Sequence, residues 1–154
     1  MSDPLIDTWQ IHDRINAYLL AAIPAGGLEA KAPSGGRSVA QAFGHLHNVR
    51  LMWLQAAGHA VPKGATKLDL DGKLTTASLT KSLAASGAAI AALIEASLAA
   101  GGKVKGFKPH VQAFVGYLIS HESHHRGQIV VALKANGTAV DKKVAYGIWE
   151  WGTR

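Results

Sequence analysis

The sequence predicts an all-α protein built as a single four-helix bundle, and three observations lead to that prediction. Four segments repeat apolar residues at spacings of three or four, the period of a helix with one buried face. No segment shows the apolar–polar alternation of a half-buried strand. Glycine, proline and capping residues separate the segments, and 154 residues suffice for one domain with a proper core.

The first helix is expected from about Pro4 to Ile23, because Asp3 can cap it and proline suits its first turn. His12 lies on the apolar face of this helix, where it could approach a bound metal as an outer-shell partner or fourth ligand. A histidine satisfied by a neighbouring backbone group is more common at such a position. The apolar face consists of Leu5, Trp9, His12, Ile15 and Leu19.

The second helix is expected from Val39 to about Ala57, opened by a capping-box pattern at residues 38–41. The preceding loop contains glycines and Arg37 and could bind a phosphate or carboxylate at the helix N-terminus, although a plain loop is favoured. Asn48 and Arg50 are interpreted as surface or outer-shell groups. The central apolar stripe consists of Val39, Ala42, Leu46, Val49 and Trp53.

The third helix should begin after a cap at Thr75 or Thr76 and end at Gly101-Gly102. It has little charge and no histidine, so its predicted role is structural. Its buried face consists of Leu79, Leu83, Ile90, Ile94 and Leu98.

The fourth helix should run from Pro109 to Asn136-Gly137. Two glycines inside it, Gly116 and Gly127, each cost about 1 kcal/mol relative to alanine, a cost that close packing would offset. Gly127 lies two residues after His125, which predicts a neighbour approaching the histidines. The apolar face consists of Val111, Phe114, Leu118, Ile129 and Ala132.

Two further stretches outside the four predicted helices belong to the same single domain, which spans residues 1–154. Residues 58–74 are polar and broken by glycine and proline, so they should cross the outside as a long connection. Residues 138–154 are too short for another layer. Their apolar side chains, among them Ile148, Trp149 and Trp151, should fold back over the bundle or meet a second subunit.

The fourth helix carries a candidate metal site. Positions four apart nearly eclipse on a helix, so His121 and His125 project from one face, one turn apart. Both lie in the apolar stripe, where an unpaired polar group is costly, and a metal ion completed by a ligand from another helix would satisfy them. His124 is the first substitute, since three residues also bring side chains onto one face.

The third ligand is sought on the second helix. His45 lies at one edge of its stripe, and His47 lies about 200° away from it, so the two cannot serve the same ion. Periodicity favours His45 only slightly.

The octet His121-Glu-Ser-His-His-Arg-Gly-Gln128 resembles the signature of the DinB-like superfamily, also called DinB/YfiT-like. In that family the first histidine of the metal triad lies eight residues before a tryptophan, and His45 and Trp53 match. Trp9-Gln-Ile-His-Asp-Arg14 is similar to the family's first helix. The resemblance implies a triad of His45, His121 and His125 and an up-down-down-up helix order. Ser120 departs from it, since many members have asparagine there.

Three neutral imidazoles suit zinc or nickel, with iron or copper as alternatives, and no thiolate is present to select among them. Three protein ligands leave positions open to water or substrate, as in catalytic sites. Some DinB-like relatives are transferases that use a low-molecular-weight thiol, and others are described as hydrolases. The resemblance therefore implies one of these activities, and the alternative is a non-catalytic metal-binding or stress-response protein.

The amino-acid composition limits the expected location of the protein and its expected binding partners. There are no cysteines, no signal-peptide pattern and no continuous apolar run of about 18 residues, so a cytoplasmic protein without a membrane segment is expected. The net charge of +6 is scattered, without a basic stripe, which disfavours nucleic acid. Arg126 could bind an anionic substrate or, more simply, a carboxylate of a neighbouring helix. Family members often pair, so a homodimer is expected.

Overall fold

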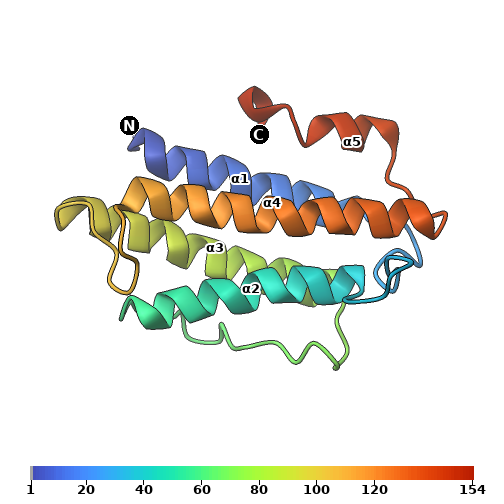
Figure 1. Cartoon of the computed structure of the whole chain (residues 1–154), viewed down its shortest axis with the longest axis horizontal. Helices are drawn as coiled ribbons and strands as arrows, with labels where there is room; N and C mark the ends of the chain where they lie inside the picture. The colour runs from blue at the N-terminus through green and yellow to red at the C-terminus, as the bar shows by residue number, and fades with distance from the viewer. Residues whose placement is uncertain (1) are drawn as a thin grey trace.

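The computed structural model describes residues 2–154 and consists of four long helices packed side by side (Figure 1). No strand forms in that part of the chain; two isolated bridges join Lys31 to Ser38 and Lys103 to His110. The all-α bundle predicted from the sequence is therefore confirmed. The long helices are α1 (Pro4–Ala21), α2 (Val39–Ala56), α3 (Thr76–Ala99) and α4 (Val111–Ala135), followed by α5 (Lys142–Gly147) and a 3₁₀ turn (Trp151–Thr153).

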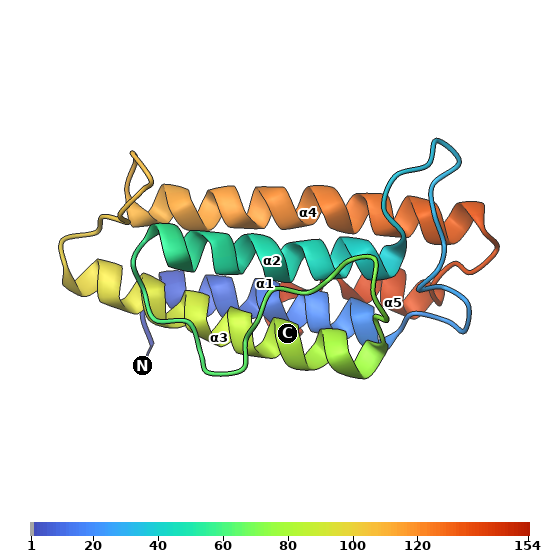
Figure 2. The same cartoon turned by 90° about the horizontal axis from the view of Figure 1, so that it is seen from below.

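The helices follow an up-down-down-up order. In Figure 1, α1 and α4 run from left to right, whereas α2 and α3 run from right to left. The parallel pair α2–α3 requires a long return, and residues 57–75 make it across the outside of the bundle (Figure 2). Asn48 holds this connection by two hydrogen bonds with the backbone of Leu68, at 2.9 and 2.8 Å.

Local side-chain chemistry sets the helix ends. The Asp3 carboxylate accepts from the Leu5 amide, and capping boxes at Ser38 and Thr75 open α2 and α3, as the sequence predicts. Two predicted ends were wrong. The first helix stops at Ala21 rather than about Ile23. Helix α4 starts at Val111 rather than Pro109, because the His110 side chain caps it by accepting from the Ala113 amide.

The apolar core forms two clusters, one at each end of the bundle. On each of α1, α2 and α4, buried polar residues separate the apolar residues of one cluster from those of the other. The predicted apolar stripes of α1, α3 and α4 are mostly buried. The buried face of α2 is centred about one residue away from the stripe predicted for that helix. Val49 and Trp53 are only partly buried, whereas Phe43, Arg50 and Leu54 are fully buried.

Helix α3 is long and apolar enough to cross a membrane on length and composition alone. Lys81 and Glu95 carry charges within this helix, and the uncharged stretch between them, residues 82–94, is shorter than the about 18 residues that a spanning helix requires. Its buried face packs against α1 and α2, so the helix belongs to the core of the bundle.

The glycines of α4 are not sites of close packing, contrary to the prediction. A methyl group added at Gly116 or Gly127 would meet nothing within 4 Å. The close approach lies instead on α3, where a methyl group at Gly87 would collide with the Asp13 carboxylate of α1.

The C-terminal segment folds back along α1 and α4 (Figure 1). Val140, Val144 and Ile148 pack against the core, and the Arg154 guanidinium lies 3.8 Å from the centre of the Tyr18 ring. Trp149 remains 76% exposed, so the segment covers the bundle without burying all of its own apolar surface.

Candidate metal centre

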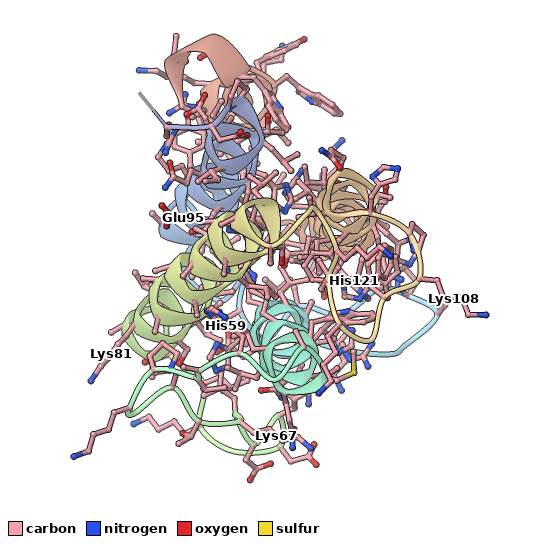
Figure 3. All side chains as sticks on the ribbon, turned by 90° about the vertical axis from the view of Figure 1, so that its left-hand side faces the viewer. His59, Lys67, Lys81, Glu95, Lys108 and His121 are labelled. Carbon is pink, nitrogen blue, oxygen red and sulfur yellow. The ribbon has the colours of Figure 1, made fainter. Side chains whose placement is uncertain are left out.

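Helices α2 and α4 bring His45, His121 and His125 together. Each offers a ring nitrogen, and the three nitrogens lie within 4.8 Å of one another. The antiparallel packing of α2 on α4 produces this meeting, and Figure 3 places His121 on the side of α4 that faces α2. The three residues are those that the sequence and the family resemblance singled out.

The spacing of the nitrogens fits one ion. The Nε2 atoms of His121 and His125 are 3.1 Å apart. Two nitrogens bound tetrahedrally to zinc at about 2.0–2.1 Å would be about 3.3 Å apart. The pair therefore needs little adjustment to share a metal, and His45 closes the third side, its ring centre 4.6 Å from that of His125.

Gln128 selects the useful tautomer of His125. The His125 Nδ1 lies 2.9 Å from Gln128 Oε1, and a carbonyl oxygen only accepts, so Nδ1–H donates. This leaves the lone pair on Nε2, the nitrogen that faces His121. The buried Nδ1 of His121 has no such partner among residues 2–154, so the two rings differ in outer support.

All three imidazoles are held neutral. Burial and the nearby charge of Arg37 lower the pKa of His45 to about 4. Burial also lowers the pKa of His121 and that of His125, although Glu122 opposes the first shift and Gln128 the second. Because the neutral ring is the metal-binding form, the site is ready to bind a cation at neutral pH.

An aromatic cluster forms one wall of the centre. The Tyr117 ring lies almost parallel to that of His121, at 6.4 Å and 12°, and packs against Trp53, 5.5 Å away. Phe107 and Phe114 complete the cluster. The tryptophan eight residues after His45 thus belongs to the wall that covers His121.

A cavity of about 540 Å³ lies beside the centre, between α4 and the loop that precedes α2. Gln128, which contacts His125, lines it together with Ala42, which lies three residues before His45 on α2. Arg37 and His124 also line it. A molecule in this cavity would meet Gln128, the hydrogen-bond partner of His125, and the positive charge of Arg37.

A buried polar network crosses the bundle next to the centre. Glu122, the residue after His121, accepts hydrogen bonds from Arg50 Nε at 2.7 Å and Arg50 Nη2 at 2.9 Å. It also accepts from His12 Nε2 at 2.8 Å and from Asn16 Nδ2 at 2.7 Å. Arg50 further binds Asp13 at 2.8 Å and donates to the Leu83 carbonyl at 3.1 Å, so the network reaches all four helices.

The charges in this network stabilise one another. Burial opposes ionisation of Glu122, but the Arg50 charge and the hydrogen bonds from Arg50 and His12 outweigh it and hold the pKa of Glu122 well below its usual range. Burial lowers the pKa of His12 despite its contact with Glu122, so its ring is neutral. Glu122 is a permanent carboxylate engaged by four donors, and it is not available as a general base.

Three residues proposed near the metal from sequence lie elsewhere or act differently. His12 binds the Glu122 carboxylate, neither a metal ligand nor a backbone group. Arg126 donates to Asn16 Oδ1 at 2.7 Å and Ser123 Oγ at 3.0 Å, so the expected carboxylate partner was wrong. His124 is exposed and outside the histidine group.

The structure also shows where His47 and Arg50 of α2 lie. His47 is buried beneath the long connection, where its Nε2 lies 2.9 Å from the Thr66 carbonyl, away from the triad as expected. Arg50 is fully buried and ion-paired, so its interpretation as a surface or outer-shell group was wrong.

The sequence contained a signal for the missed network. His12 and Asn16 follow Trp9 at helical spacing, Arg50 follows Leu46, and Glu122 follows Leu118. Each lies where the apolar stripe continues, and charged residues are almost never fully buried unless paired. An acid and a base at stripe positions on different helices therefore predict a buried pair.

Comparison with protein families gives one match. The model of the DinB family matches residues 1–147 of the 154. That range includes all four long helices and the three clustered histidines. Comparisons with curated proteins and with solved structures found no match.

Proposed function

The chain belongs to the DinB family, and on that premise we propose that it binds one divalent metal ion through His45, His121 and His125 and acts as a metal-dependent enzyme. The observation that carries the proposal is the gathering of three ring nitrogens within 4.8 Å of one another. Other features of the chain support it: neutral rings, a fixed tautomer at His125, and an adjoining cavity.

Three histidines leave coordination positions for a further ligand, which suits a catalytic more than a closed structural site. A divalent ion held there would supply Lewis acidity, which lowers the pKa of a water molecule or thiol. We favour zinc or nickel, with iron or copper as alternatives, because imidazole suits all of these ions.

The chain's own residues would bind and orient the substrate. The cavity beside the histidines is large enough for a small molecule, and Arg37 supplies a positive charge on its wall. The chain has no cysteine, so a thiol nucleophile would have to come from a low-molecular-weight thiol. Two reactions follow from this arrangement: thiol-dependent S-transfer to an electrophile in the cavity, or hydrolysis with water in the place of the thiol.

We further propose a cytoplasmic homodimer that acts on a small molecule. We disfavour nucleic acid as the partner, and this choice is supported by the positions of Lys67, Lys81 and Lys108, which project from separate sides of the bundle (Figure 3). Light scattering at micromolar concentrations tests the dimer: a mass of one chain throughout that range contradicts it.

Metal analysis of purified protein tests the site. The wild type should bind about one equivalent of zinc or nickel, and His125→Ala should bind none while its helical circular dichroism is retained. His124→Ala is the matched control, because that ring is adjacent in sequence and outside the histidine group, and it should keep a full equivalent. A full equivalent in His125→Ala would show that the ligand set is wrong.

Turnover assays then separate the reactions. Metal-loaded protein is supplied with candidate thiols and an electrophile, and His45→Ala serves as the metal-free reference. Metal-dependent consumption of thiol supports transfer, whereas product formed without thiol supports hydrolysis. Tight metal binding without turnover over a broad panel would favour the second candidate, a non-catalytic metal-binding or stress-response protein.

A further inference from the structure

A second cavity lies on the opposite flank of α4, beneath the C-terminal segment. Its volume is about 610 Å³, within the range of small-molecule sites. Its walls are mainly apolar and include Ile119, Val130 and Ile148, with Trp149 and Trp151 contributed by the C-terminal segment. We propose that this cavity binds a small amphipathic carboxylate, with its chain against the apolar wall and its head group at Arg126, while Lys134, about 12 Å further along α4, adds positive charge to the same cavity.

Arg126 is the first observation that indicates an anion. Arg126 lines the cavity, and its hydrogen-bond partners are neutral: Asn16 Oδ1 at 2.7 Å, Ser123 Oγ at 3.0 Å and His12 Nδ1 at 3.4 Å. A partly buried cation without a direct carboxylate partner is costly, and an anionic ligand would offset that cost.

The other residues that line the cavity add positive charge and no negative charge. Lys134 lies two helical turns beyond Arg126 on α4 and lines the same cavity. It forms no ion pair with a carboxylate in the described part of the chain, and no acidic side chain lines the cavity. The cavity thus offers positive charge and apolar surface without negative charge, which complements a carboxylate with an apolar body.

The C-terminal segment supplies the apolar cover. Ile148 packs against the core, whereas the Trp149 ring is 76% exposed although it lines the cavity. A ligand chain held against this ring would remove apolar surface from water, at about 25 cal/mol for each Å² of apolar area buried. The exposed indole also gives a direct optical signal of binding.

This cavity is separate from the histidine centre. Gly127 is common to both linings, on the ridge of α4 between them. None of His45, His121 and His125 lines either cavity, but Gln128, the hydrogen-bond partner of His125, lines only the first. Binding there should therefore be independent of metal, and the inference does not depend on the proposed reaction.

The test uses full-length protein and three probes: octanoate, which has charge and chain, octanol, which has only the chain, and acetate, which has only the charge. Calorimetry should show one octanoate per chain, octanol binding at least about tenfold more weakly, and no saturable acetate binding. Octanoate should also change tryptophan emission, and Trp149→Phe should reduce that change.

Charge variants locate the bound carboxylate. Arg126→Gln and Lys134→Gln should each weaken octanoate binding several-fold, whereas the exposed Lys142→Gln, outside the cavity, should not. Lys134 is exposed and forms no ion pair, so its variant remains informative if Arg126→Gln fails to fold. His45→Ala should bind octanoate as the wild type does.

Several results would overturn the proposal: equal affinity for octanol and octanoate, no effect of either charge variant, or loss of octanoate binding in His45→Ala. The last result would place the carboxylate at the histidine centre. Octanoate affinity that falls as protein concentration rises would show that a second copy of the chain covers the cavity instead.

Discussion

The buried Arg50–Glu122 pair offers the sharpest test of the structure. Replacing Glu122 with glutamine keeps the shape of the side chain and removes its charge. The carboxylate now receives two hydrogen bonds from Arg50, at 2.7 and 2.9 Å, and one each from His12 and Asn16. In the Glu122→Gln variant one carboxylate oxygen becomes an amide NH₂ that faces these donors, and Arg50 retains only Asp13 as a counter-charge.

The size of the effect follows from these contacts. A hydrogen bond to a charged group contributes about 1.5–3 kcal/mol and a neutral one about 0.5–1.5 kcal/mol, so two weakened bonds to Arg50 lose roughly 2–3 kcal/mol. The donor that now faces donors raises the expected loss to the roughly 3–5 kcal/mol typical of a broken buried pair. For a chain of this length, the melting temperature should fall by about 6–20 °C.

Urea unfolding of metal-free protein measures this loss, and a double-mutant cycle isolates the pair. Arg50→Met and Glu122→Gln should each be strongly destabilising, but the double variant should cost clearly less than their sum. In it neither member of the pair remains as an unpaired charge, and the loss of the Asp13 contact is common to Arg50→Met and the double variant. A loss below about 1 kcal/mol for Glu122→Gln, or single effects that add within about 0.5 kcal/mol, would refute the buried pair.

Three further predictions use single substitutions. Gly116→Ala should raise the free energy of unfolding by about 1 kcal/mol, because its methyl group meets open space within a helix. Gly87→Ala should lower the free energy of unfolding, because its methyl group collides with an aspartate of α1. Equal effects of the two variants in urea unfolding would contradict this. Gln128→Ala should weaken metal binding by roughly 10–100-fold in a chelator competition, whereas His124→Ala should leave it unchanged. An unchanged metal affinity of Gln128→Ala would show that Gln128 does not orient the His125 ring. The folded pKa of His12 is depressed below its ordinary value of 6.5, so its contribution to stability is present above that pH and is lost as pH falls below it. The unfolding free energy of wild type should therefore fall more between about pH 7.5 and pH 5.5 than that of His12→Gln, and identical slopes would count against a buried neutral ring.

The fold was predictable because its determinants are local. Apolar spacing predicted four helices and the buried faces of α1, α3 and α4, and the caps at Asp3, Ser38 and Thr75 are read directly from residue type. The start of the fourth helix was misjudged because a histidine cap at His110 is not among the usual capping residues. Helix order was supplied by the family resemblance, since periodicity alone does not determine which helices are parallel.

The candidate metal centre was only partly predictable from residue patterns. Spacing on one helix pairs His121 with His125, but which residue of α2 faces them depends on the rotation of that helix. The stripe of α2 is centred nearer Phe43 and Arg50 than the sequence indicated. His45 therefore came from the family pattern rather than from periodicity.

The contacts between side chains of different helices were the property least predictable from the sequence. The contacts of Arg126 with Asn16, and of His12 with Glu122, depend on the angle at which α1 meets α4. The open surroundings of Gly116 and Gly127 likewise depend on what lies across from them. Sequence spacing determines the face of a side chain but not the group that it meets.

The buried network and the histidine centre share the same two helices, and this bears on how the centre is built. His45 and Arg50 lie on α2, five residues apart, and His121 and Glu122 are consecutive on α4. Apolar contacts are non-directional and tolerate small shifts of one helix along another. A two-point guanidinium–carboxylate contact has a fixed geometry, so the Arg50–Glu122 pair sets the position of α2 along α4. The same constraint sets where His45 stands relative to His121 and His125, which explains why a costly buried pair lies directly beside them.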